Sequence, residues 1–544
     1  MNTSIQSRGV AADSDDGRWR GRLLRLLMLL VLCRAVYAVY FCQQLDLAGD
    51  EAYYWDWGRR PDWGYFSKPP MIGWLMGLVT MVSAGWTELG VRLTALLLGT
   101  VSLVLLHQLA RQVVGSRAAF LTVLVALLTP ANVALNLFLT IDAPLVLCWT
   151  AALLLFWKAL RQPERLGVWL ALGLVMGAGV LSKQMMLVFP VLMLITVVSR
   201  PDRGRLLRAP GLWVAVVLGV LALLPVLAWN ARHAWITLEH TRHHFDAEVL
   251  GIAGRVERFA LFPLLQMLIY TPVTWLLLMA VAVVMVRRWR TADLGERFLT
   301  VFSVLPLSAF FLLALRQEIN PNWPAVYYIG LMVLLGRWLA GAGLAGGGKL
   351  GAGWRRWALG VGAVMTLAVY ALPAVIQLAG WQGKSGVDVF ADLRGWRQAG
   401  VQADVLLARC PHPDRTLVVV LGHRYNAAHM AFEMPSHPQV FRWERDGSVQ
   451  SQYEVWPSPA DRIGWDAMVI YPDSDDGLPR RDLMRSFWKH FAGREVMGDI
   501  DVEIGNGRRY RAQVFLCRDM KQWPPPVQDQ ETDPTKAVGT GGQP

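Results

Sequence analysis

Residues 22–42 read RLLRLLMLLVLCRAVYAVYFC, an apolar run whose only charged members are arginines. A helix needs about 20 predominantly apolar residues to cross a bilayer, and this run is long enough. It continues into Gln43 and Gln44 and lacks the small-residue cleavage site of a secretory signal. We therefore predict a membrane span that is retained, rather than a leader that is removed.

Similar runs continue as far as Pro373 in a chain that is 54% hydrophobic and 17% charged, with a mean hydropathy of +0.34. A soluble core would show shorter apolar runs with polar faces. We predict a polytopic α-helical membrane protein with about 11–13 spans. Residues 71–85 are apolar but short, which indicates an interfacial or re-entrant segment. The eleven clearest spans lie near residues 22–42, 91–110, 118–137, 143–160, 166–182, 184–199, 211–229, 260–286, 298–315, 323–340 and 355–378.

The net charge of +12 is carried by basic clusters in alternate loops. An excess of lysine and arginine marks the cytoplasmic loops of membrane proteins, so this pattern predicts a cytoplasmic N-terminus and argues against nucleic acid as a partner. With eleven spans, the opposite face then receives every notable polar group. These groups are Asp50, Glu51, Lys68, Asp142, Ser182, Lys183, the stretch 229–246 and the stretch 316–323.

The composition divides the chain into four parts. Residues 1–20 are predicted to be a disordered cytoplasmic segment, and residues 21–378 the membrane domain, with outer loops at 43–70 and 230–258. Residues 379–523 are expected to form a small outer α/β domain, and 524–544 a disordered tail. Three strands are expected at 416–421, 467–471 and 512–517. Cys410 and Cys517 lie outside the spans, which leaves room for one disulfide.

The first outer loop carries Gly49-Asp50-Glu51-Ala52-Tyr53-Tyr54-Trp55 and later Tyr65-Phe66-Ser67-Lys68-Pro69-Pro70. A carboxylate under an apolar roof is suited to act as a general base toward a hydroxyl. An acidic pair after glycine is equally suited to capping a helix N-terminus. Lys68, fixed before two prolines, suits a lipid phosphate, although a lysine whose charged end simply reaches water at the membrane surface is the alternative.

Further polar residues follow on the same predicted face. Asp142 before Pro144 fits either a helix cap or a second acid of the site. Lys183 stands between two apolar runs, which favours a polar cavity. His240 and His244 have the spacing of metal ligands on a helix, but aromatic anchors with arginines meeting lipid phosphates are the more ordinary interpretation. The aromatic residues of the first loop suit stacking on a sugar ring, and they equally suit an interfacial belt.

These motifs resemble those of the bacterial polyprenyl-phosphate-sugar glycosyltransferases, the family of protein O-mannosyltransferases and lipid A aminoarabinose transferase, which has the GT-C fold. The resemblance covers about residues 20–340 and includes Asp142-Ala143-Pro144, Ser182-Lys183 and Asn322-Trp323-Pro324. Weaker likeness extends to Arg424-Tyr425-Asn426 and to Ser451–Pro457.

The resemblance implies a multi-pass enzyme of the bacterial inner membrane, with its active site and C-terminal domain in the periplasm. It would transfer a sugar from a polyprenyl-phosphate donor to a lipid, glycan or protein acceptor, without a nucleotide sugar. Membrane lipids are expected partners. The predicted roles are catalysis for Asp50, Glu51 and Asp142, binding of the donor phosphate for Lys68, Lys183, Arg232 and His233, and sugar or acceptor binding for Tyr53, Tyr54, Trp55, Tyr65 and Asn322.

One position departs from the family pattern. Members that act on lipid A typically carry an acidic residue directly before the lysine of the KPP element, where this chain has Ser67. This departure argues against metal assistance and against aminoarabinose as the sugar, so no metal ligand is assigned, although the chemistry leaves room for a divalent cation. Two other functions compete with the enzyme. A flippase for lipid-linked sugars would favour ionisable groups near mid-membrane and internal repeats, and an envelope scaffold would depend only on the outer domain.

Overall fold

The structure is a computed structural model, and it describes residues 3–243, 251–443, 449–473 and 487–523. The chain forms two compact units. Residues 1–45 and 57–379 make the first, which we call the helical unit, and residues 46–56 and 380–544 make the second, which we call the sheet unit. The predicted tail at 524–544 lies outside the described residues, as does part of the outer loop predicted at 230–258.

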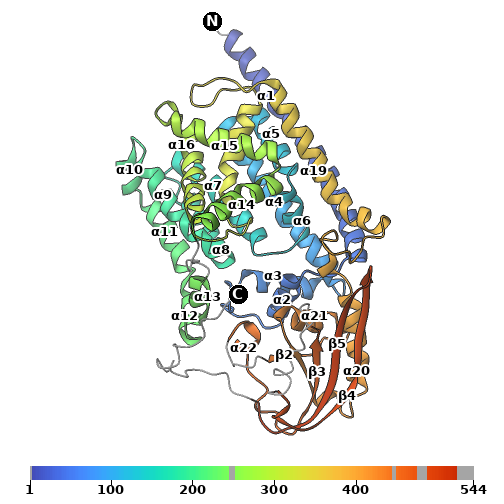
Figure 1. The fold of residues 1–544 in the computed structure, drawn as a ribbon. Helices are drawn as coiled ribbons and strands as arrows, with labels where there is room; N and C mark the ends of the chain where they lie inside the picture. The colour runs from blue at the N-terminus through green and yellow to red at the C-terminus, as the bar shows by residue number, and fades with distance from the viewer. Residues whose placement is uncertain (1–2, 244–250, 444–448, 474–486, 524–544) are drawn as a thin grey trace. The chain divides into compact units, whose positions relative to one another are not determined.

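The helical unit is a bundle whose first and last long helices, α1 and α19, run side by side (Figure 1). Tyr37 on α1 and Tyr370 on α19 meet edge to face, with ring centroids 4.8 Å apart. The helices of this unit are α1 (Thr3–Gln44), α3 (Met71–Val82), α4 (Thr87–Val114), α5 (Ser116–Leu127), α6 (Pro130–Leu137), α7 (Asp142–Arg161), α8 (Leu166–Ser182), α9 (Val188–Val198), α10 (Arg203–Arg208), α11 (Pro210–Leu221), α12 (Leu224–Arg232), α13 (Ile236–His243), α14 (Ile252–Tyr270), α15 (Pro272–Arg287), α16 (Leu294–Val301), α17 (Val304–Leu313), α18 (Tyr328–Leu339) and α19 (Ala352–Leu378).

Six stretches in the described residues are long and apolar enough to cross a membrane, and there are eight candidates if two bent helix pairs each count as one. The bent pairs are α5 with α6, at 75°, and α14 with α15, at 115°. These eight coincide with eight of the eleven predicted spans. The other three, near 166–182, 184–199 and 323–340, are also helical, but each falls among the shorter apolar helices of 10–17 residues. The membrane fold class is confirmed, while length and composition support six to eight spans.

Small residues set how closely the helices of this unit approach. A side chain added at Gly211 on α11 would come within 2.1 Å of the Trp169 ring on α8. A side chain added at Gly173 or Gly177 on α8 would likewise come within 2.8 Å of Leu218 on α11 or 2.9 Å of Ala222, directly after α11. Without a hydrophobic driving force between helices in lipid, such close backbone packing is what holds spans together. The helix α1 begins at Thr3, so the backbone is helical across most of the segment predicted to be disordered.

The sheet unit contains a five-stranded mixed sheet in the order β2-β1-β3-β5-β4. Strand β1 pairs in parallel with β2 and β3, whereas β5 runs antiparallel to both β3 and β4. The strands are seen in orange and red in Figure 1. The elements of this unit are α2 (Gly49–Gly58, of which Trp57 and Gly58 are counted with the helical unit), α20 (Trp396–Ala408), β1 (Thr416–Leu421), α21 (Arg424–Glu433), β2 (Val440–Trp443), α22 (Gln452–Val455), β3 (Asp466–Pro472), β4 (Phe491–Gly505) and β5 (Arg508–Met520).

The predicted small α/β domain is confirmed, and its three predicted strands correspond to β1, β3 and β5. Strands β2 and β4 were missed, since β2 has four residues and β4 lacks a continuous apolar stretch. All six residues of β1 are buried, and this burial explains the continuous apolar run from which the strand was predicted. Cys410 and Cys517 are both free thiols in this unit, so the disulfide considered from the sequence is not formed. Burial raises the pKa of Cys517 to about 12.

Candidate active site

The acidic pair of the first outer loop lies at the start of α2, within the sheet unit. The Glu51 carboxylate reaches back to the preceding turn, where its Oε2 accepts a hydrogen bond of 3.0 Å from the N–H of Ala48. This is one half of a capping box, which satisfies a backbone donor that the helix itself leaves without a partner. Glu51 is fully buried. Of the two readings of the acidic pair, the helix cap therefore describes Glu51.

Asp50 makes a different contact, with a residue 375 positions later in the chain. Its Oδ1 accepts a hydrogen bond of 2.9 Å from the hydroxyl of Tyr425, the second residue of α21. The Tyr425 ring also lies on Gly49, where an added Cβ would come within 2.6 Å of the ring. Glycine at position 49 is thus what allows the tyrosine to approach Asp50. Burial, followed by the neighbouring Asp50 charge, raises the pKa of Tyr425, so its hydroxyl stays protonated and available as a donor.

An arginine completes this cluster in the sheet unit. The Arg424 guanidinium lies 4.9 Å from the centroid of the Tyr425 ring and 5.8 Å from that of Tyr53. Its Nη2 is 3.5 Å from the Tyr425 oxygen, at the long limit of a hydrogen bond. The neighbouring His423 is exposed but has a lowered pKa, because of desolvation first and then the charges of Arg424 and Arg442. The cluster around Asp50 thus contains cations, yet its direct donor is a neutral hydroxyl.

The aromatic residues predicted to bind sugar on α2 are packed inside the sheet unit. Tyr53, Tyr54 and Trp55 are 2%, 4% and 3% exposed. The Tyr53 ring stacks on Tyr453, and its hydroxyl accepts the backbone N–H of Gln452. Trp55 meets Phe432 edge to face at 5.0 Å. These rings hold α2 against the C-terminal elements, and their faces are covered by protein in this unit.

A second polar cluster lies in the helical unit. Asp142, the first residue of α7, forms an ion pair with Lys183, whose Nζ is 2.8 Å from Asp142 Oδ1. The Asn322 side-chain amide donates a 2.7 Å hydrogen bond to the other oxygen, Asp142 Oδ2. Both charged side chains are nearly buried, at 9% exposed for Lys183 and 12% for Asp142. Three residues that the sequence assigned to catalysis, phosphate and sugar are here joined in one group.

Other buried polar residues belong to the same unit. The side chain of Gln266 on α14 is fully buried and donates to the carbonyl of Pro321, one residue before Asn322. The ring of Tyr270 on the same helix contacts that of Tyr328 at a tilt, with centroids 4.4 Å apart, and Trp275 donates to the Tyr328 hydroxyl. These contacts brace the chain around residue 322 from one side. These contacts therefore hold the loop that carries Asn322 in the position where its amide binds Asp142.

The loop that carries Lys68 is fastened to the region of α12 and α13. The indole N–H of Trp229 donates to Asp62 Oδ2 at 2.7 Å, and the hydroxyl of Thr237 donates to the carbonyl of Tyr65 at 2.8 Å. Gly64 lies on the Trp229 ring, where an added Cβ would come within 2.8 Å of it. Lys68 is half-buried, and its carbonyl accepts the N–H of Tyr65. The sequence segments 62–68 and 229–237 therefore form one structure.

The remaining predicted residues of the helical unit divide between exposed and buried. Arg232 is exposed at the end of α12. The His233 ring stacks on Trp229 at 4.0 Å, and its Nδ1 lies 2.8 Å from the Trp229 carbonyl. Tyr65 is fully buried, stacked on Trp57, and hydrogen-bonded to the carbonyls of Trp57 and Arg60. Tyr65 thus fixes the loop, while Arg232 stands in solvent. His244, of the pair considered as metal ligands, lies outside the described residues.

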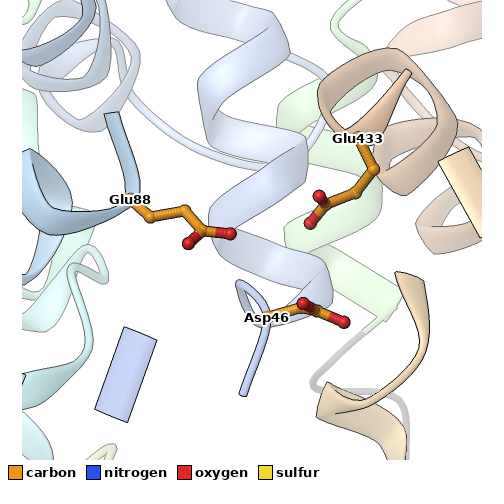
Figure 2. Close-up of side chains that lie close together, drawn as sticks. All are labelled: Asp46, Glu88 and Glu433. Atoms are coloured by element: carbon orange, nitrogen blue, oxygen red, sulfur yellow. The ribbon is translucent and has the colours of Figure 1, made fainter. Parts of the chain in front are cut away.

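Two carboxylates of the sheet unit lie close together, those of Asp46 and Glu433, with ligand atoms within 4.8 Å (Figure 2). Glu88, also labelled there, belongs to the helical unit. Asp46 Oδ2 accepts the N–H of Trp396 at 2.8 Å, at the N-terminus of α20. An acid in that position is favoured by the helix dipole. The geometry therefore gives Asp46 a capping role at the start of α20.

The structure thus groups the predicted residues into two clusters, one in each unit. Asp50 and Glu51 lie on α2 in the sheet unit, whereas Asp142, Lys183 and Asn322 join in the helical unit. Sequence reasoning missed the roles of Tyr425, Asp62 and Trp229. Tyr425 and Trp229 belong to sequence segments noted above, but the sequence does not show which residue either of them contacts.

A helical membrane unit and a small mixed-sheet unit together define the fold class of this chain. The fold matches that of ArnT from Cupriavidus metallidurans in the apo state, with a TM-score of 0.55 and 17% identity, over 91% of this chain and 98% of that one. The similarity spans both units and shows a shared fold.

Sequence comparisons agree with this class. Residues 67–229 match the family model described as dolichyl-phosphate-mannose-protein mannosyltransferase. The lipid A galacturonosyltransferase RgtD of Rhizobium johnstonii is 28% identical over 292 residues, which are 53% of this chain and 60% of that protein. The match thus takes in about three fifths of the relative's length. Together these findings confirm the predicted resemblance and support a membrane glycosyltransferase of the GT-C type.

Proposed function

We propose that the protein transfers a sugar from a polyprenyl-phosphate donor to a hydroxyl of an envelope acceptor on the periplasmic side of the bacterial inner membrane. The acceptor that we favour is lipid A or the attached core, because the relative matched over 292 residues is a lipid A galacturonosyltransferase. The observation that carries the proposal is the ion pair of Asp142 and Lys183 inside an apolar helical unit. Charged groups in such surroundings are costly and are retained for function.

In the proposed reaction, the acceptor hydroxyl oxygen attacks the anomeric carbon of the sugar and a new C–O bond forms. The bond from that carbon to the phosphate oxygen breaks, and its electron pair leaves with the polyprenyl phosphate. The hydroxyl proton passes to the carboxylate of Asp50, which acts as general base. A phosphate is a stable leaving group, and fixed cations stabilise the charge that develops on it.

The cations are proposed to divide this work. Lys68 sits in a loop fixed by two hydrogen bonds to the Trp229–Thr237 region, which suits a point charge held toward the donor phosphate. Arg232 is exposed at the end of α12 and suits the same anionic headgroup. Lys183 is already paired with Asp142, so we assign it to organising that acid together with Asn322.

The test is a transfer assay with the purified full-length protein in lipid nanodiscs. Extracted polyprenyl-phosphate sugars and lipid A are supplied, and mass spectrometry follows the donor and acceptor pools for the wild type, Asp50→Asn and Asp142→Asn. We expect a loss of donor matched by a gain in acceptor mass in the wild type, and neither in Asp50→Asn.

Two results would overturn the proposal. Folded wild-type protein that consumes no lipid-linked sugar would exclude the transferase, and a parallel proteoliposome assay for movement of the donor across the bilayer would identify a flippase instead. Transfer that continues in Asp50→Asn would remove Asp50 from the reaction while keeping the activity. Exchanging lipid A for a polypeptide acceptor in the same assay decides between the two acceptor classes.

A further inference from the structure

We propose that Tyr425, supplied by the sheet unit, is the positioning residue that holds the proposed base Asp50 for transfer. This inference deepens the proposed function and rests on it. It also gives the C-terminal unit a defined part in the reaction, because residues 46–56 are counted with that unit.

The first observation is the contact itself. The Tyr425 hydroxyl donates to Asp50 Oδ1 at 2.9 Å, and the described residues of the sheet unit provide that carboxylate with no ion pair. A hydrogen bond to a charged oxygen is stronger than one between neutral groups, and it fixes the rotation of the carboxylate. One oxygen is thereby committed to Tyr425, which leaves Oδ2 to receive a proton.

The second observation is the space around Gly49. The ring atoms Cγ and Cδ2 of Tyr425 and its Cβ lie 2.6, 2.8 and 3.0 Å from where a Cβ at position 49 would be. Cβ atoms in proteins essentially never come within 3.0 Å of such neighbours, so any larger residue forces the ring or the helix to move. The tyrosine is thus held on both sides of the first turn of α2, by packing on Gly49 and by hydrogen bonding to Asp50.

The third observation is that α2 is fixed to the same unit at a second place. The Tyr53 hydroxyl accepts the N–H of Gln452, and Ser451 next to it binds Glu454. Glu454 in turn pairs with the buried Arg442 at 2.7 Å. With α2 held independently by this group, removal of one hydroxyl from Tyr425 leaves the helix in place. The contact is therefore suited to setting the direction of Asp50 rather than to supporting the fold.

The decisive variant is Tyr425→Phe, which removes the hydroxyl and keeps the ring on Gly49. We expect kcat to fall roughly tenfold with little change in KM, because the carboxylate loses the contact that fixes its rotation toward the acceptor hydroxyl. We also expect the acidic limb of the pH–rate profile to move to higher pH, because a donor to the carboxylate favours its charged form. The charged and titratable groups near Asp50 in this unit are Tyr425, His423 and Arg424.

Tyr510→Phe is the matched control. Tyr510 is a half-buried tyrosine of the same unit, its ring centroid lies 4.7 Å from that of Trp396, and its buried hydroxyl has no hydrogen-bond partner in the part of the chain that the structure describes. We expect this variant to keep the wild-type rate and pH profile. Gly49→Ala is the second probe, and we expect it to lower kcat at least as far as Tyr425→Phe, because it displaces the same ring.

The outcomes separate the two proposals. An inactive Asp50→Asn together with a wild-type rate and pH profile in Tyr425→Phe would overturn the inference and leave the proposed function standing. Equal losses in Tyr425→Phe and Tyr510→Phe, with no displacement of the acidic limb, would also overturn it, since that result reports a general loss of packing. Full activity in Asp50→Asn would overturn both proposals at once.

Discussion

Asp50 and Asp142 both stand in the first turn of a helix, but their charges are balanced in different ways. Asp142 is bound by Lys183 at 2.8 Å and by the Asn322 amide at 2.7 Å, inside the helical unit. Asp50 is half-buried and is bound in the sheet unit by a tyrosine hydroxyl at 2.9 Å. Both oxygens of Asp142 are already hydrogen-bonded, whereas Asp50 has one oxygen bound to Tyr425 and the other left to receive a proton. The comparison favours Asp50 as base and Asp142 as an organising residue.

The largest expected effect is on the transfer rate, and it distinguishes Asp50 from Asp142. Asp50→Asn is expected to lower the transfer rate by about 10²–10⁴-fold, the usual contribution of a general base, while thermal stability changes little. Initial rates and unfolding temperatures of the same preparations measure both quantities. If Asp50→Asn lost stability as well, the comparison would fail, because Asp50 would then support the fold as well as take part in the reaction.

The next effect concerns stability in the helical unit. Lys183→Met leaves the Asp142 carboxylate buried without its cation, and we expect a cost of about 3–5 kcal/mol in the free energy of unfolding. Thermal unfolding in detergent reports it. The double variant Asp142→Asn with Lys183→Met should recover much of the loss, since no isolated charge remains.

Lys384→Met, at an exposed lysine of the sheet unit, is the control for charge removal. We expect it to leave the unfolding temperature unchanged. Strictly additive effects of the two single variants at Asp142 and Lys183 would show that the pair is not coupled, and would remove the contrast with Asp50.

These differences bear on what could be known from the sequence. The membrane spans could be predicted because a helix in lipid requires a long apolar run. The strands β1, β3 and β5 could be predicted because a buried strand requires a shorter apolar run. Asp50, Asp142 and Lys183 stood out because charge beside apolar runs is rare. The sequence also offered a helix-capping reading of the acidic pair, and the contact of Glu51 with Ala48 fits it.

What could not be predicted depends on contacts between distant segments. Nothing near position 50 indicates that its partner is Tyr425, or that residues 46–56 are counted with the C-terminal unit. The sequence of an aromatic run does not distinguish rings that stack on a sugar from rings that lie at a membrane interface or pack in a core. Tyr53 and Trp55 are core residues of the sheet unit because of partners at positions 432–453, which only the fold brings near.

A smaller effect is expected at Asn322. Asn322→Ala removes the second hydrogen bond to Asp142 but leaves Lys183, so the expected loss is about 1.5–3 kcal/mol, the range for a hydrogen bond to a charged group. Unfolding temperature measures it, with Asn320→Ala as control because Asn320 is also exposed but it is the side chain of Asn322 that binds Asp142. A loss as large as that of Lys183→Met would mean that the amide, rather than the ion pair, holds Asp142.

The smallest effect is expected at Glu51, the neighbour of Asp50, and it compares the two adjacent carboxylates of α2. Glu51→Ala removes the carboxylate that accepts the Ala48 N–H, and loss of such a cap costs about 1 kcal/mol. Glu51→Gln keeps an acceptor oxygen in the same place, and glutamine serves equally in a capping box. We therefore expect Glu51→Gln to retain both stability and transfer, whereas the same exchange of acid for amide at Asp50 abolishes transfer. Loss of transfer in a stable Glu51→Gln protein would instead make the pair of carboxylates, rather than Asp50 alone, the reacting group.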